Sequence, residues 1–129
     1  MIFLDASFLI NLYVEKNENH DQAVELWKDI ENEDKIISKF IITEILTVFN
    51  NKIKPFDIDN INRIYNLILN DCEVIDDFHY FNQTIVEFFK NNLGFFDTLY
   101  IVLLKDLNIE RIASFDEHFD NKEGIIRVH

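Results

Sequence analysis

Short apolar runs alternate along the chain with longer segments in which apolar residues recur every three or four positions. The short runs are typical of buried strands, and the longer period is typical of helices. The predicted strands cover residues 1–4, 36–37, 73–75, 111–114 and 125–128. The predicted helices cover 8–15, 18–32, 40–51, a segment that ends at Leu69, 78–91 and 97–105. Strands that alternate with helices predict an α/β fold with a parallel sheet covered on both faces.

Polar residues and chain breakers indicate where these helices begin and end. Ser7 can cap the first helix, and Asp57 or Asp59 can cap the fourth. The third helix is expected to end before Pro55, and Gly94 separates the last two helices. Because one proline and two glycines are spread over 129 residues, we expect long helices and short loops within one domain over residues 1–129.

Four acidic residues follow the predicted strands, at the edge where parallel sheets bind their ligands. Asp5 ends the first strand, and Asp116 follows the fourth. Glu44 lies among apolar neighbours in the helix after the second strand, and Asp97 opens an almost entirely apolar helix. Structural alternatives remain, since Asp5 and Asp116 also suit turns or caps and Asp97 suits a helix cap. That alternative is weakest for Glu44, because a solvated helix face should have polar neighbours three and four residues away.

No basic residue is predicted near the four acids, so their charges would repel one another without a cation. A hard divalent cation, Mg2+ or Mn2+, suits them because such ions prefer oxygen ligands. The four histidines show no zinc-ligand spacing with Cys72 and are interpreted as surface or core residues. Cys72 also lies next to acids that should raise its pKa, and the chain has no Gly-x-Ser-x-Gly segment, so nothing indicates a nucleophilic triad.

The composition gives the chain a strongly negative net charge, which at first argues against binding to nucleic acid. The chain has 12 Lys and Arg against 24 Asp and Glu, a formal charge of −12, whereas proteins that bind DNA or RNA are usually basic. Gly94 and Gly124 are too far apart for a Walker A loop or a dinucleotide-binding fingerprint. One cysteine, no recognisable secretion signal and no apolar run of about 20 residues lead us to expect a cytoplasmic protein without a membrane partner.

Four ordered segments carry a resemblance to a known family. They are Leu4-Asp5-Ala6-Ser7, Thr43-Glu44, Gly94-Phe95-Phe96-Asp97 and Ala113-Ser114-Phe115-Asp116-Glu117-His118-Phe119. With these segments in this order over essentially its whole length, the sequence resembles the PIN-domain ribonucleases, most closely the VapC-type toxins of prokaryotic type II toxin–antitoxin pairs. The resemblance implies a three-layer α/β/α sandwich around a short, mostly parallel sheet of about five strands.

The resemblance also implies roles for individual residues. The acids that bind one or two Mg2+ or Mn2+ ions and support catalysis would be Asp5, Glu44, Asp97 and Asp116. Ser7 and Ser114 would occupy the hydroxyl positions of the family beside these acids, and Asp120 would be an outer acid. Gly94 departs from the family pattern, because relatives often carry Ser or Thr near this position, and the last helix therefore lacks a capping hydroxyl.

The activity implied by the resemblance is hydrolysis of RNA phosphodiester bonds by metal-activated water. The implied partners are RNA, a cognate antitoxin and a second copy of the chain. The alternative is a non-catalytic PIN-like module that binds RNA or a protein partner without cleavage.

Two other magnesium-binding classes fit less well. Haloacid-dehalogenase-type phosphatases need Asp-x-Asp where this chain has Asp5-Ala6-Ser7, and response-regulator receivers need a lysine near the position of Asp116.

Overall fold

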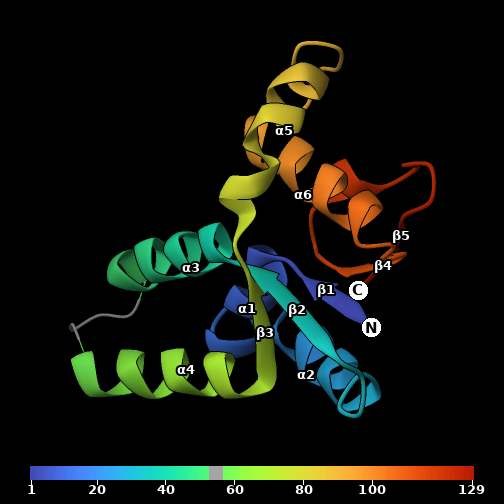
Figure 1. Cartoon of the computed structure of the whole chain (residues 1–129). Helices are drawn as coiled ribbons and strands as arrows, with labels where there is room; N and C mark the ends of the chain where they lie inside the picture. The colour runs from blue at the N-terminus through green and yellow to red at the C-terminus, as the bar shows by residue number, and fades with distance from the viewer. Residues whose placement is uncertain (53–56) are drawn as a thin grey trace.

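The computed structural model describes residues 1–52 and 57–129 and is built around a five-stranded sheet (Figure 1). The strands are β1 (Ile2–Leu4), β2 (Lys35–Ser38), β3 (Cys72–Ile75), β4 (Arg111–Ala113) and β5 (Ile126–Val128). They lie in the order β3-β2-β1-β4-β5, and every neighbouring pair is parallel. The predicted α/β class and five-stranded sheet are confirmed, with a sheet that is parallel throughout.

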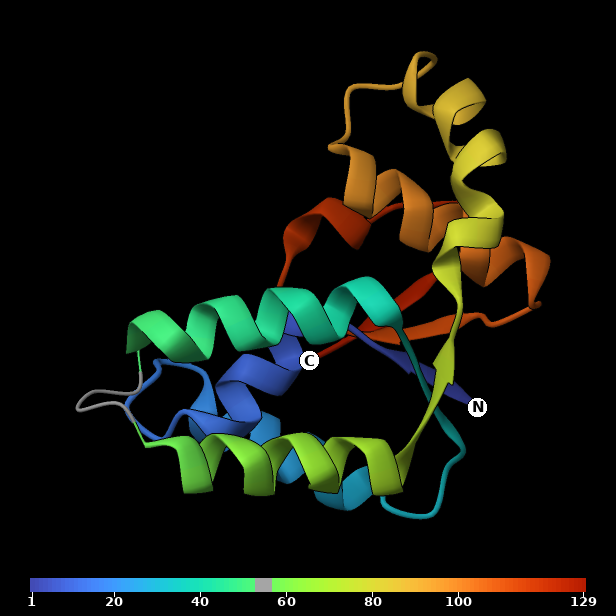
Figure 2. The same ribbon diagram turned by 60° about the vertical axis from the view of Figure 1, so that its left-hand side comes forward.

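The helices occupy both faces of this sheet. They are α1 (Ala6–Tyr13), α2 (His20–Asp29), α3 (Lys39–Lys52), α4 (Ile58–Asp71), α5 (Phe81–Phe88) and α6 (Phe95–Asp106), with single 3-10 turns at η1 (Asp77–Tyr80) and η2 (Glu117–Phe119). The chain moves outward from β1 to β3 and then returns to the other side of β1. Since connections between parallel strands are nearly always right-handed, this reversal places α1–α4 on one face and α5 and α6 on the other. Figure 2 shows this arrangement.

The reversal of strand order lies between β1 and β4. In a parallel sheet such a switch point opens a crevice beyond the carboxyl ends of the two strands. The register aligns these ends, because Leu4 pairs with Ala113 and the amide of Asp5 donates to the carbonyl of Ala113 at 3.0 Å. The residues after β1 and β4 therefore share one edge of the sheet.

The hydrophobic core fixes the elements that border this crevice. All three residues of β1 are fully buried, as expected for a central strand with helices on both faces. Helix α6 buries Leu99, Tyr100, Leu103 and Leu104, as expected for an almost entirely apolar helix. No helix within residues 1–52 or 57–129 is long and apolar enough to cross a bilayer.

The residues that cap three helices show where each helix begins, and they change or decide the predicted starts. The first helix begins at Ala6 instead of Phe8, because Asp5 and not Ser7 is its N-cap. Of the two candidates for the fourth helix, Asp57 is the cap, and its side chain accepts a hydrogen bond from the amide of Asn60 at 3.0 Å. The last helix begins at Phe95 after Gly94, so that Asp97 lies within its first turn and does not open it.

Two predicted helices are too long. The second extends only over His20–Asp29, and the segment predicted as 78–91 is divided into η1 and α5, which ends at Phe88. Helix α3 ends at Lys52, and the prediction about Pro55 falls outside the described residues.

Candidate metal centre

A cavity of about 480 Å3 opens at the edge where the switch point predicts a crevice. Its walls come from the segments that follow β1 and β4, from α1 and α3, and from the first half of α6. All four predicted acids line it: Asp5, Glu44, Asp97 and Asp116. Four segments that are far apart in the sequence therefore bring their carboxylates to one space.

Asp5 is the most deeply placed of these acids, with 6% of its surface exposed. Its Oδ2 accepts hydrogen bonds from Ser7 Oγ at 2.5 Å, Ser114 Oγ at 2.8 Å and the amide of Ser7 at 3.3 Å. The two hydroxyl oxygens in turn accept from the amides of Phe115 and Asp116, each at 3.0 Å. Because a serine hydroxyl has a single hydrogen, both hydroxyls are committed to Asp5 and fix its orientation.

Glu44 is half-buried on α3, and two residues absent from the sequence predictions hold it in place. The hydroxyl of Tyr100, a residue that is 1% exposed, donates to Glu44 Oε2 at 2.7 Å. At the start of α3, the buried carboxylate of Asp77 accepts from the amide of Phe40 at 2.9 Å. Tyr100 therefore orients the carboxylate, while Asp77 anchors the helix that carries it.

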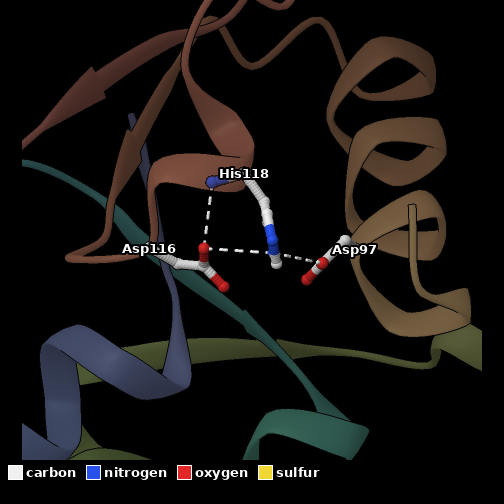
Figure 3. A group of neighbouring side chains, drawn as sticks. All are labelled: Asp97, Asp116 and His118. Atoms are coloured by element: carbon white, nitrogen blue, oxygen red, sulfur yellow. Dashed lines mark hydrogen bonds and ion pairs between the residues drawn. The ribbon is translucent and has the colours of Figure 1, made fainter. Parts of the chain in front are cut away.

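Asp97 and Asp116 meet at His118, where the side chains of all three point toward one another (Figure 3). Asp116 caps η2, since its Oδ1 accepts from the amide of His118 at 2.9 Å. The Nδ1 atom of His118 lies 3.0 Å from Asp97 Oδ2 and 3.2 Å from Asp116 Oδ1. The expectation that no basic residue lies among the acids is therefore wrong. The spacing Asp-x-His in one tight turn was the available signal for this contact.

The cavity opposes ionisation of its own acids. Burial raises the pKa of Asp5 above its ordinary value. Burial, followed by the charges of Asp5 and Asp97, raises the pKa of Glu44, and burial followed by the charge of Asp116 raises that of Asp97. A divalent cation bound among these oxygens would favour their charged forms. The donor set, which consists of carboxylates supported by hydroxyl groups, suits a hard cation such as Mg2+ or Mn2+.

Asp120, the outer acid of the sequence prediction, does not line the cavity. Its two carboxylate oxygens pair with Arg127 at 2.6 and 2.8 Å, and this contact lowers the pKa of Asp120. Arg127 also donates to the carbonyl of Ser114 at 3.2 Å. Asp120 is thus linked to the cavity through Arg127 and the backbone that positions the Ser114 hydroxyl.

Cys72 lies away from this site, at the start of β3 and at the opposite edge of the sheet. Burial, followed by the charge of Asp71, raises the pKa of its thiol to about 12. A thiol that stays protonated at neutral pH is a poor nucleophile, which agrees with the sequence interpretation of Cys72.

Solved structures with the same fold come from bacteria and an archaeon. VapC20 of Mycobacterium tuberculosis, a toxin that cleaves the sarcin-ricin loop, is 17% identical, with a TM-score of 0.76 over 91% of each chain. VapBC2 of Rickettsia felis, solved bound to a DNA fragment from its promoter, is 16% identical, with a TM-score of 0.67 over 99% of this chain and 98% of that one. PAE2754 of Pyrobaculum aerophilum is 18% identical, with a TM-score of 0.70 over 98% and 88% of the two chains. At these identities the likeness shows the shared fold.

Sequence comparison assigns the family. No curated protein matches the chain in sequence. The family model described as PIN domain, in contrast, matches residues 2–125, which include every segment that lines the acidic cavity. The chain therefore belongs to the PIN-domain family.

Proposed function

We propose that the chain is a metal-dependent endoribonuclease, formed by one PIN domain over residues 1–129. The observation that carries this proposal is the convergence of four acids on one cavity, where burial raises the pKa of three of them and the charges of neighbouring acids add to this for Glu44 and Asp97. Among the described side chains, no lysine or arginine forms an ion pair with any of the four. Carboxylates that share a half-enclosed space without a lysine or arginine partner are costly unless a cation joins them.

The residues of the chain would divide the work as follows. Asp5, Glu44, Asp97 and Asp116 would hold one or two Mg2+ or Mn2+ ions. A bound ion of this kind supplies an activated water and neutralises charge that develops on the phosphate. Ser7 and Ser114 keep Asp5 in one orientation, and Tyr100 does the same for Glu44. This chemistry requires no serine, cysteine or histidine nucleophile.

The direct test is RNA cleavage by the purified chain with Mg2+, with Mn2+ and with EDTA. Cleavage should require a divalent ion and should be lost in Asp97→Asn, while circular dichroism shows an unchanged fold. Metal-dependent RNA binding without cleavage by the unaltered chain would favour the alternative, a non-catalytic PIN-like module. Cleavage that persists in EDTA or in Asp97→Asn would contradict the proposed mechanism.

A VapC-type role, with a cognate antitoxin and RNA as partners, is part of this proposal. Its support is the shared fold with VapC20, a toxin that cleaves the sarcin-ricin loop, and with VapBC2. Expression of the chain alone in a bacterial host should arrest growth, and Asp97→Asn should relieve the arrest. Unimpaired growth with accumulated, folded protein would contradict a toxin role.

A second copy of the chain is the other proposed partner, and one surface suits it. This aromatic face runs along η1 and α5 and consists of Phe78, Phe81, Ile85, Phe88 and Phe89, which recur at helical spacing. Phe78 is 71% and Phe89 81% exposed, although the face packs on Phe95 of α6 through ring contacts of 5.3 and 5.8 Å. Clustered exposed rings are typical of the core of a protein interface.

Charge favours a second copy over RNA at the aromatic face. Residues 78–96 contain one acid, Glu87, and one lysine, Lys90, and these two form an ion pair. In a symmetric dimer a surface meets itself, so a neutral face avoids the repulsion expected elsewhere on a chain of charge −12. Single-stranded RNA would instead require basic residues beside the rings.

The dimer proposal is tested by light scattering and sedimentation. Phe89→Lys should convert the dimer to a monomer, whereas Ile58→Lys, which changes an exposed apolar residue at the start of α4, should not. A monomeric unaltered chain, or a dimer that survives Phe89→Lys, would contradict the assignment of this face.

A further inference from the structure

We propose that His118 is a ligand of the same metal centre, together with Asp97 and Asp116. This nitrogen ligand would bias the centre toward first-row transition metal ions, here Mn2+, and away from Mg2+. The inference rests on the proposed function only in requiring that the acidic cavity binds a divalent ion. It adds a residue outside the four predicted acids and a preference for one class of ion.

The spacing of the three donor atoms fits one ion. In an octahedral site with bonds of about 2.1 Å, neighbouring ligand atoms are about 3.0 Å apart. His118 Nδ1 lies 3.0 Å from Asp97 Oδ2 and 3.2 Å from Asp116 Oδ1. One ligand atom from each of the three residues lies within 4.8 Å of the other two. The three residues can therefore contribute to one coordination shell without a large movement (Figure 3).

The backbone around His118 holds it in position. Its own amide is bound by Asp116 Oδ1, and the next residue, Phe119, is 1% exposed and anchors η2 in the core. Asp97 is fixed on the opposite side by the first turn of α6. His118 thus approaches the acids from a short turn that one buried residue anchors, although 63% of its side chain is exposed.

Binding a metal requires only a change of tautomer. An ionised carboxylate accepts hydrogen bonds and cannot donate them, so beside ionised Asp97 and Asp116 the hydrogen is on Nδ1. For Nδ1 to bind a metal, this proton must move to the other ring nitrogen. The exposure of the imidazole allows that nitrogen to be solvated.

The chemistry of the donor distinguishes the ions. Mg2+ is usually held by carboxylates and waters and has little preference for imidazole, whereas first-row transition ions bind imidazole well. A centre with the four cavity carboxylates and one imidazole should therefore retain Mn2+ better than Mg2+. If His118 were only a counter-charge for the acids, its removal would affect both ions alike.

The decisive measurement is pulsed EPR of Mn2+ bound to the full, untagged chain. A directly bonded imidazole nitrogen modulates the spin echo, and this modulation should be present in the unaltered protein and absent in His118→Ala. The matched control is His79→Ala, which removes an exposed histidine that is not grouped with Asp97 and Asp116. His118→Asn, which keeps a polar side chain, guards against a folding defect in the alanine variant. It should also lose the modulation.

Calorimetric titration of the same proteins gives the second readout. His118→Ala should weaken Mn2+ binding by about tenfold and change Mg2+ binding by less than about twofold. The inference is overturned if the unaltered protein shows no nitrogen modulation, or if Mn2+ and Mg2+ binding fall equally.

These outcomes separate the inference from the proposed function. A protein that cleaves RNA with Mn2+ but shows no nitrogen modulation would refute the role of His118 and leave the nuclease intact. A protein that shows the modulation but cleaves no RNA would refute the nuclease and leave His118 as a ligand.

Discussion

Two groups of carboxylates in this chain lie in opposite electrostatic environments. The cavity acids Asp5, Glu44 and Asp97 have raised pKa values, mainly because of burial. The paired acids, defined here as Glu33, Asp76 and Asp120, have lowered pKa values, because hydrogen bonds from Arg111, Lys39 and Arg127 favour their charged forms.

Among the described side chains, lysine or arginine partners lie beside the paired acids, and none forms an ion pair with a cavity acid. Within the part of the chain that the structure describes, ion pairs with lysine and arginine side chains stabilise the charged form of each paired acid. Asp5 and Glu44 are instead held by serine and tyrosine hydroxyls, which orient a carboxylate without neutralising it, and Asp97 contacts the imidazole of His118. A carboxylate that is oriented by hydroxyl groups and has no lysine or arginine partner is suited to an exchangeable cation.

The largest expected difference between the two groups is in RNA cleavage. Asp5→Asn should lower the rate of cleavage by more than about 100-fold. Losing a residue that only supports a metal ligand typically costs about 10- to 100-fold, and Asp5 is proposed as a ligand itself. Asp120→Asn should retain most of the activity, since it lies outside the cavity. Cleavage rates measured with Mn2+ at saturating RNA test both variants. Equal losses of rate in the two variants would contradict the distinction between cavity acids and paired acids.

The second largest expected difference between cavity acids and paired acids is in the stability that a bound metal ion adds. At an Mn2+ concentration of 100 times Kd, binding adds about 2.7 kcal/mol to the free energy of unfolding. Thermal melts should show this gain in the unaltered protein and in Glu33→Gln, and a reduced gain in Glu44→Gln. An unaltered protein whose Tm does not respond to millimolar Mn2+ would contradict the metal centre.

Without metal, the cavity acids should destabilise the fold as the pH rises. The pKa of Asp5 is raised above 3.8, so its cost to folding is absent below that pH and complete above its folded-state pKa. Asp5→Asn should therefore increase the free energy of unfolding at pH 7 in EDTA, by about 1 kcal/mol. Asp120 has a lowered pKa, so its contribution is present above pH 3.8 and lost as the pH falls through its folded-state pKa.

Denaturant titrations in EDTA at pH 4 and pH 7 test this opposite behaviour. The advantage of Asp5→Asn should shrink toward pH 4, while Asp120→Asn should destabilise the protein at pH 7. An Asp5→Asn variant that is less stable than the unaltered chain at pH 7 in EDTA would show that the cavity acids are paired.

The smallest expected effect comes from a partly exposed pair. Arg111→Gln removes the partner of Glu33, whose side chain is 27% exposed, and should cost about 0.5 kcal/mol. The cost should fall in high salt, which screens exposed charges. A loss of unfolding free energy several times this size that does not depend on salt would contradict the description of Glu33 as a partly exposed, paired acid.

The sequence was sufficient to predict the sheet and the four acids because both follow local rules. A central strand such as β1 is apolar on both faces, and the acids directly follow strands or interrupt apolar helices. Contacts between distant segments had no such local signal. His118 reaches Asp97 across 21 residues, and Tyr100 reaches Glu44 across 56. Asp5 was recognised as an acid at a strand end, but its competition with Ser7 for the helix cap depended on backbone geometry.

The order of the cavity residues along the chain has a consequence for protein synthesis. Asp116 is the last of the four acids to be made, and β4, which must pair with β1 beside Asp5, precedes it by only a few residues. A nascent chain that has emerged only as far as α6 contains Asp5, Glu44 and Asp97 but lacks the strand that completes this edge of the sheet. A ribosome that makes this protein is therefore not exposed to a complete cavity until β4 and Asp116 have been translated.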